Sequence, residues 1–264
     1  MSANVSVVIP FYNSEKTILR TLYSIFNQSL KPLEIVIVVD GCNDVFIKSI
    51  LDENRSIFSE IPIVLKVLVE NSGPSFARNI GVQISVGKYV AFLDSDDVWH
   101  SQKIELQYYF MEKFSLYFSY HLYGRYTETE FSKRFSLDEL NLRYKSKKMF
   151  ILKQYIATPT VMVLKEKFIP FCEHLKYCED YHCWLNILEN EKEFSYLDFN
   201  LAFGFKNPIG ESGLSANIYK MHKGFLKANE LLYRDKKISL FFYIFSNILE
   251  CIKFPLRFFK RVLW

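Results

Sequence analysis

The sequence predicts an α/β fold with a mostly parallel central sheet and a helical extension at the C-terminus. Two observations support this prediction. Four short apolar runs in the first hundred residues alternate with three segments whose apolar residues recur at helical spacing. The runs are nearly continuous and do not alternate between apolar and polar residues, as expected of parallel strands that are covered on both faces. A length of 264 residues is enough for such a domain with an extension.

Strands and helices follow one another at a spacing that favours parallel strands joined by right-handed crossovers. Each predicted strand is an apolar run that stops at a polar turn, and most of the runs are rich in Val, Ile or Leu. The predicted strands are Val5–Ile9, Leu33–Val39, Ile63–Val69 and Tyr89–Leu93, and the predicted helices are Glu15–Gln28, Val45–Asn54 and Ser75–Val86.

Beyond residue 100 the pattern is less regular, and a polar segment over 128–148 is predicted to be an insertion. We predict helices at Ser101–Phe114 and Cys178–Asn190, strands at Leu116–Tyr126, Ala157–Leu164 and Phe194–Phe203, and a loop over 206–215 that contains Gly210 and Gly213.

The residues that follow the four parallel strands are expected to meet at one edge of the sheet. They are Phe11 and Tyr12, Asp40, Asn71 and Asp94. Open α/β sheets bind nucleotides at this edge. The turn after the first strand contains no glycine, which excludes a classical dinucleotide-binding dehydrogenase, and no Gly-Lys-Ser/Thr loop is present, which excludes a P-loop NTPase.

Three carboxylates, Asp94, Asp96 and Asp97, directly follow the fourth apolar run. They repel one another unless a cation neutralises them, and oxygen ligands at this spacing suit Mg²⁺ or Mn²⁺. A divalent ion held there can clamp a diphosphate. The alternative is a solvated acidic turn in which Asp97 caps the helix that follows.

Charge is unevenly distributed along the chain, whose formal net charge is +4. Residues 236–264 contain six basic residues and one acid, a net charge of +5, whereas the remainder contains 27 basic and 28 acidic residues, a net charge of −1. A nearly neutral body argues against nucleic acid as a partner. The N-terminus has no basic start and no long apolar run, and the five cysteines have no paired spacing, so we expect a cytoplasmic body with reduced thiols.

A cluster of cysteine and histidine residues raises the alternative of a zinc site. Structural zinc sites usually have tighter, paired spacings such as Cys-x₂-Cys, so we favour core thiols. The cluster consists of Cys172, His174, Cys178, His182 and Cys183.

Five motifs occur in an order that resembles family 2 glycosyltransferases of the GT-A fold. They are 5–13 (Val-Ser-Val-Val-Ile-Pro-Phe-Tyr-Asn), the strand end at Asp40, 73–81 (Gly-Pro-Ser-Phe-Ala-Arg-Asn-Ile-Gly), 92–99 (Phe-Leu-Asp-Ser-Asp-Asp-Val-Trp) and 179–184 (Glu-Asp-Tyr-His-Cys-Trp). The resemblance implies a catalytic domain over 1–215, with a Rossmann-like nucleotide-sugar-binding half at 1–100 and an acceptor-binding half at 101–215, followed by the extension at 216–264. It also implies inversion at the anomeric carbon and a nucleoside-diphosphate-sugar donor, which we expect to be a UDP-sugar.

The resemblance assigns the turn after the first strand to the donor's nucleobase. Pro10 belongs to this turn, Phe11 and Tyr12 would lie beside the base, and Asp40 would accept a hydrogen bond from a ring N–H. Where the family usually has two acids, this chain has Asp40 followed directly by Gly41.

The same resemblance assigns the donor's ribose and phosphates to residues near the acidic cluster. Arg78 would reach the phosphates or the cluster, and Asp94 and Ser95 would contact the donor. Asp96 would hold Mn²⁺ or Mg²⁺, which would offset the charge that builds up on the leaving diphosphate.

Asp180 is the candidate general base. Inversion needs a carboxylate that takes the proton of the acceptor hydroxyl while its oxygen attacks. The resemblance implies this role for Asp180, with Glu179 and Trp184 on the acceptor side. The alternative is that Glu179 and Asp180 only complement the dipole of the helix that they begin.

The C-terminal tail combines basic residues with bulky apolar ones. The apolar run at Ile238–Leu249 is too short to span a bilayer, which takes ~20 apolar residues. After Pro255, apolar residues alternate with Arg257, Lys260 and Arg261, as in a helix that lies on an anionic membrane surface. The alternative is a helix that packs on the catalytic domain.

We therefore predict a metal-dependent inverting glycosyltransferase that moves a hexose or N-acetylhexosamine from a UDP-sugar to a glycan or lipid-linked glycan acceptor. Bacterial surface polysaccharide or lipooligosaccharide synthesis is the expected setting, at the cytoplasmic face of the cell membrane. The alternatives are a nucleotidyltransferase acting on sugar phosphates, which would normally carry a Gly-rich basic loop after its first strand, and a non-catalytic sugar-nucleotide-binding or glycan-binding protein, which would lack the acids.

Overall fold

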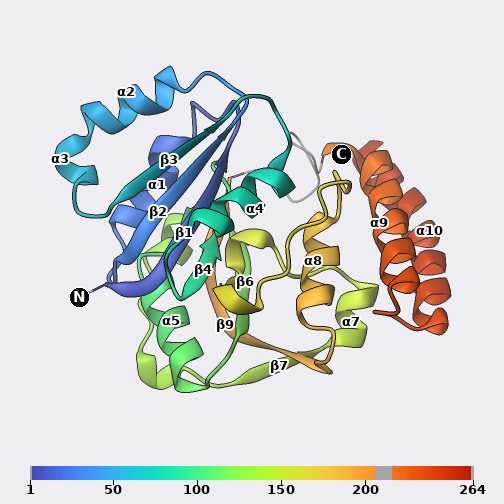
Figure 1. Ribbon diagram of the computed structural model, residues 1–264. Coiled ribbons are helices and arrows are strands. Elements are labelled where there is room, and N and C mark those ends of the chain that lie inside the picture. Colours follow the sequence, from blue (N-terminus) through green and yellow to red (C-terminus); the bar gives the residue numbers. More distant parts are fainter. Residues whose placement is uncertain (1, 206–215, 263–264) are drawn as a thin grey trace. The chain divides into compact units, whose positions relative to one another are not determined.

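A computed structural model describes residues 2–205 and 216–262 and divides the chain into two compact units (Figure 1). Unit 1 contains Met1–Tyr144, Ile156–Phe168 and Ser195–Phe205, and unit 2 contains Lys145–Tyr155, Ile169–Phe194 and Lys206–Trp264. The predicted loop at 206–215 lies outside the described residues. The predicted domain boundary at 215 and 216 falls at its end and stays a prediction.

The described strands form one nine-stranded sheet with the order β3-β2-β1-β4-β8-β6-β9-β5, and β7 pairs with β9. β1, β2, β3 and β4 are parallel, as predicted, and β8 pairs antiparallel with β4 and with β6. The strands are β1 (Ala3–Phe11), β2 (Pro32–Asp40), β3 (Ile63–Leu68), β4 (Tyr89–Phe92), β5 (Val98–Trp99), β6 (Phe118–Arg125), β7 (Arg143–Ser146), β8 (Met162–Leu164) and β9 (Glu193–Gly204).

Helices connect the parallel strands as the apolar spacing predicts, each within a few residues of its expected bounds. α4 packs over β1 and β2, and the apolar side of α1 is buried in the unit 1 core with Leu22 and Ile25. The described helices are α1 (Ile18–Phe26), α2 (Val45–Glu53), α3 (Arg55–Phe58), α4 (Pro74–Ile84), α5 (Lys103–Lys113), α6 (Glu128–Phe131), α7 (Lys147–Leu152), α8 (Glu179–Ile187), α9 (Ile218–Arg234) and α10 (Leu240–Val262).

The expectation that all four parallel strands are covered on both faces is wrong for β3. This strand lies at the end of the strand order, and Val64 and Val67 are exposed. An apolar run in the sequence therefore marked an edge strand here, because Val and Ile favour strands whether or not both faces are covered.

The predicted strand at Ala157–Leu164 is only partly correct. Its first half is a 3₁₀ turn at Thr158–Thr160, and only Met162–Leu164 forms a strand. Pro159 explains the difference, because proline has no N–H to donate to a neighbouring strand. The predicted insertion at 128–148 contains α6, a 3₁₀ turn at Leu137–Glu139, β7 and the start of α7.

In unit 2, α9 packs against both α8 and α10, and α10 also contacts α7 (Figure 1). α10 continues through Pro255, so the apolar run at 238–249 and the basic segment after it belong to one helix. No helix in the described part of the chain is both long enough and apolar enough to cross a membrane.

A buried lysine is an unexpected part of the unit 1 core. Lys103 is fully buried, its Nζ lies 3.8 Å from the ring centroid of Trp99, and no hydrogen-bond partner for this nitrogen exists among the described residues. Burial holds the pKa of Lys103 well below its ordinary value. The amine is therefore more easily deprotonated in the folded protein than in the unfolded chain.

We predict that Lys103→Met raises the free energy of unfolding by about 1–3 kcal/mol, the usual penalty of a buried unsatisfied donor. Because the unfolded chain binds the extra proton, wild-type stability should rise as the pH increases towards 10.5, the ordinary pKa of lysine, and the variant should lose this part of the slope. Urea unfolding across this pH range measures both effects. The exposed Lys113→Met on the same helix is the control, and a less stable Lys103→Met would contradict the prediction.

Candidate donor-binding site and candidate base

The carboxyl ends of the parallel strands form one edge of unit 1, and the direction of chain winding reverses there. β1 pairs with β2 on one side and with β4 on the other, in the order 3-2-1-4. Such a reversal opens a crevice between the two central strands, where α/β proteins bind nucleotides. The turn that contains Tyr12 follows β1, and the acidic loop that begins at Asp94 follows β4, so both segments lie at this edge.

Helix α1 holds the backbone of the acidic loop that follows β4. The Thr21 hydroxyl donates to the carbonyl oxygens of Ser95, at 3.1 Å, and Asp97, at 2.8 Å, and the Arg20 guanidinium donates to the Asp96 carbonyl at 2.9 Å. The Ser95 hydroxyl also donates to that of Ser14. These bonds fix the path of the loop without using any of its carboxylates.

The Asp94 and Asp97 carboxylates of this loop contact side chains on other elements. The Arg78 guanidinium on α4 lies 2.6 Å from Asp94 Oδ1, and the Tyr123 hydroxyl on β6 donates to Asp97 Oδ1 at 2.8 Å. Desolvation, followed by the charge of Asp97, raises the pKa of Tyr123, so the hydroxyl keeps the proton that it donates. Asp96 is half-buried.

Asp97 does not cap the next helix, which corrects that alternative. α5 begins at Lys103, with Gln102 as its N-cap residue. The Asp97 carboxylate instead bonds Tyr123, in a space that depends on Gly204: a Cβ there would lie 2.1 Å from the Tyr123 hydroxyl oxygen. Asp97 therefore links the acidic loop to the opposite part of the sheet.

The chemistry of this loop fits a divalent cation that is bound together with a substrate. The described residues contain no group of three or more His, Cys, Asp or Glu side chains placed to hold a metal. Mg²⁺ typically takes one or two protein carboxylates and completes its shell with water and substrate phosphates. Asp96, with Asp94 two residues away, matches that kind of site.

Asp40 lies at the same edge but is almost entirely buried. Its two carboxylate oxygens accept the backbone N–H groups of Ser72, at 2.7 Å, and Gly73, at 2.8 Å, so it fixes the loop before α4. Gly41 is required next to it: its φ is +66°, and a Cβ would lie 2.0 Å from the backbone nitrogen of Asn71. The predicted hydrogen bond from Asp40 to a nucleobase stays a prediction.

The turn after β1 presents one aromatic ring, not two. Phe11 is fully buried in the unit 1 core, whereas Tyr12 is 48% exposed and Pro10 is half-buried. Stacking on a nucleobase needs an accessible ring face. The predicted base contact of this pair therefore rests on Tyr12.

In unit 2, Asp180 lies in the first turn of α8. The helix starts after Cys178, whose φ of +59° is left-handed, and the Asp180 carboxylate accepts the backbone N–H of Tyr181 at 2.7 Å. Glu179 is buried and Asp180 half-buried. Trp184 is fully buried against Phe171, so this structure places it in the core rather than on an acceptor-binding surface.

The cysteine and histidine cluster of unit 2 does not form a metal site within the described residues. The Cys178 thiol lies 3.7 Å from the Met221 carbonyl oxygen, and burial, with the Asp180 carboxylate adding to it, raises the pKa of this thiol to about 12. The Cys183 thiol donates to the Ile169 carbonyl. Both therefore act as protonated core thiols.

Comparisons with known proteins match this architecture. The sequence model described as "Glycosyl transferase family 2" matches residues 6–168. A relative from Escherichia coli, UDP-Glc:alpha-D-GlcNAc-diphosphoundecaprenol beta-1,3-glucosyltransferase WfaP, is 31% identical over 93% of this chain and 94% of its own. The chain belongs to glycosyl transferase family 2.

Family 2 relatives differ in how much of their length this chain spans. An uncharacterised glycosyltransferase of Rickettsia felis is 34% identical over 69% of the chain, but the match covers only 30% of that protein.

Two solved structures share the fold. Staphylococcus aureus TarS 1–349, in complex with UDP-GlcNAc, has a TM-score of 0.69 and 22% identity over 98% of this chain and 73% of that one. The mannosyltransferase PcManGT of Pyrobaculum calidifontis, in complex with GDP-Man and Mn²⁺, has a TM-score of 0.67. It is 14% identical, and the match covers 97% of this chain and 72% of that one. The predicted GT-A fold is confirmed.

We predict that Thr21→Val displaces the acidic loop. Valine matches threonine in shape but leaves the Ser95 and Asp97 carbonyl oxygens without their donor, which should lower the free energy of unfolding by about 1–3 kcal/mol. Thermal unfolding measures this effect. Thr129→Val, at an exposed position on α6, is the matched control. Unchanged stability in Thr21→Val would show that α1 does not hold the loop.

Proposed function

We propose that this protein transfers a hexose or N-acetylhexosamine from a UDP-sugar to a glycan acceptor, with inversion at the anomeric carbon. The observation that supports the donor assignment best is the fixed acidic loop at the winding reversal of unit 1, with Arg78 beside Asp94. WfaP and TarS, whose names or titles include UDP-Glc and UDP-GlcNAc, support a uridine nucleotide.

Within this proposal, unit 1 residues orient the donor. Tyr12 offers its ring to the nucleobase, and Arg78 stands near the phosphates. Asp96, with Asp94 next to it in the loop, would hold Mn²⁺ or Mg²⁺, which supplies positive charge against the leaving diphosphate. The relative bound to GDP-Man and Mn²⁺ supports a divalent ion in this fold.

Asp180 is our proposed general base. As the acceptor oxygen attacks the anomeric carbon, the bond from that carbon to the diphosphate breaks, and the hydroxyl proton passes to the Asp180 carboxylate. Asp180 lies in the first turn of α8, where the helix N-terminus stabilises negative charge. Glu179 is our proposed acceptor-side residue.

We further propose that the acceptor is a lipid-linked glycan and that the protein works at the cytoplasmic face of the membrane, in bacterial surface-glycan synthesis. The name of WfaP, which specifies a diphosphoundecaprenol-linked acceptor, supports this proposal.

Asp96→Ala should abolish turnover and metal-dependent UDP binding while the protein stays folded. The side chain lies in a surface loop, so its removal should change the free energy of unfolding little. UDP titration with Mn²⁺ and with EDTA tests the metal role directly. Asp52→Ala, at an exposed position on α2, is the control. Full activity of wild type in EDTA, or of Asp96→Ala with Mn²⁺, would contradict it.

Asp180→Asn should leave UDP-sugar affinity nearly unchanged and lower kcat by at least ~10²-fold, the lower range for loss of a general base. Asparagine keeps the size of the side chain but cannot take the proton. Steady-state kinetics with separate donor titration distinguishes the two parameters. Asp235→Asn, at an exposed position after α9, is the control, and loss of donor binding with kcat preserved would show that Asp180 is not the base.

A further inference from the structure

Helix α10 turns its polar side inward. Asn229 on α9 donates to the Ser246 hydroxyl at 3.0 Å and to Asn247 Oδ1 at 2.8 Å, and Glu250 lies 3.1 Å from Nδ1 of His222. Lys253 Nζ donates to the Leu152 carbonyl oxygen at 2.8 Å. The polar side chains of α10 named here therefore bind partners within unit 2.

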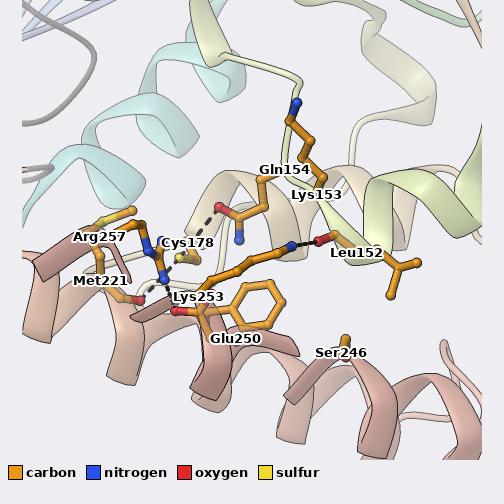
Figure 2. Close-up of a pocket in the computed structure, with 10 residues that line it drawn as sticks. Leu152, Lys153, Gln154, Cys178, Met221, Ser246, Glu250, Lys253 and Arg257 are labelled. Carbon is orange, nitrogen blue, oxygen red and sulfur yellow. Dashed lines mark hydrogen bonds and ion pairs between the residues drawn. The ribbon is translucent and has the colours of Figure 1, made fainter. Parts of the chain in front are cut away.

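A cavity of about 180 Å³ lies along this inward side. Figure 2 shows Glu250, Lys253 and Arg257 on its lining, with the Arg257 guanidinium directed at the Glu250 carboxylate and Lys253 at Leu152. Cys178 and Gln154 line it from other elements of unit 2. The charged side chains of Glu250, Lys253 and Arg257 thus point into the unit.

The opposite side of α10 is apolar and exposed. We call six of its large exposed residues, which lie on successive turns, the outer stripe. Their exposed fractions lie between 39% and 66%. The outer stripe consists of Phe241, Ile244, Phe245, Ile248, Ile252 and Leu256.

This arrangement is the reverse of an ordinary surface helix, which buries its apolar side and exposes its polar one. A contiguous exposed apolar patch marks a surface for a partner or a membrane. The two alternatives for the tail are therefore not exclusive: one side of α10 packs on α9 and contacts α7, and the other side remains available.

We propose that the outer stripe lies in the interface of an anionic lipid bilayer. Unit 2 contains 17 basic and 10 acidic residues, a net charge of +7, whereas unit 1 contains 16 and 19, a net charge of −3. An anionic surface complements unit 2, and each basic residue near such a surface contributes ~1 kcal/mol. A second copy of the chain that docked through its own unit 2 would place a net charge of +7 against a net charge of +7, and the two would repel each other.

Exposed lysines on the neighbouring helix add to this complementarity. Lys220, Lys223 and Lys227 recur along α9 and, with Lys176 and His174, line a shallow groove of unit 2 whose lining includes no acidic residue. Lys227 is also paired with Glu230, at 3.0 Å. Exposed apolar residues and basic residues within one unit are the two features of interfacial membrane binding. The proposal extends the membrane location proposed above and does not depend on the transfer chemistry.

The structure also determines how to test the proposal. Deleting residues 238–264 would remove the partners of Asn229 and His222, so loss of vesicle binding could reflect unfolding. Substitution on the outer stripe avoids this problem. We would use the full chain with Ile248→Glu and Ile252→Glu together, and separately with both residues changed to alanine, which keeps helix propensity. Met149→Glu, at an exposed apolar position on α7, is the matched control.

Co-sedimentation should be measured with vesicles of phosphatidylcholine alone and of phosphatidylcholine mixed with phosphatidylglycerol, without donor. Wild type and Met149→Glu should bind the anionic vesicles more strongly, and added salt should weaken this binding without abolishing it. The glutamate pair should lower the partition coefficient at least about tenfold, since each buried isoleucine contributes a comparable factor, and the alanine pair should lower it less. UDP affinity should be unchanged in all forms.

Vesicle binding of the glutamate pair equal to that of wild type would overturn the proposal, as would a wild type that binds no vesicles. A wild-type dimer in sedimentation velocity that the glutamate pair dissociates, without vesicle binding, would assign the outer stripe to a second copy instead. Because UDP affinity is measured separately, a failed donor assignment would not be mistaken for a failed membrane surface.

Discussion

The hold of α1 on the loop after β4 is the constraint on which the candidate donor site depends. Three carboxylates within four residues repel one another, so their own side chains cannot set the path of the backbone. Thr21, fully buried, bonds two carbonyls of this loop, and Arg20 bonds a third. Asp94 and Asp97 then meet Arg78 and Tyr123 in fixed positions. A loop fixed in this way loses little further entropy when it binds a ligand.

The strand order makes this hold possible. α1 connects β1 to β2, yet its polar residues reach the loop of β4, because β4 is the other neighbour of β1. Sequence-distant elements therefore cooperate at one strand pair. The buried Ser6 hydroxyl, which donates to Glu34 and accepts from the Gly87 N–H, joins β1 to β2 and to the start of β4 in the same way at the other end of the strands. Both ends of the parallel sheet are thus fixed by polar contacts.

The sequence allowed the parallel strands, the connecting helices and the acidic loop to be predicted, because apolar runs and helical spacing are local signals. Contacts between residues 76 positions apart, such as Thr21 to Asp97, leave no local signal, although a threonine within an otherwise apolar helix face was a hint. Burial of single side chains also leaves no local signal: Phe11 and Trp184 have the chemistry for stacking, and their rings are in the cores. In α10, Ser246, Asn247 and Glu250 interrupted an apolar run in the sequence, whereas in the structure they form one side of a helix.

The central claim is that the edge of unit 1 binds a uridine nucleotide sugar together with a divalent cation. A donor-hydrolysis panel tests it most directly, with UDP-, GDP- and dTDP-sugars each incubated with Mn²⁺ or with EDTA. We expect release of UDP from UDP-sugars in Mn²⁺, at most weak release from the other donors, and none in EDTA. Hydrolysis at the same rate in EDTA, or a preference for GDP- or dTDP-sugars, would contradict it.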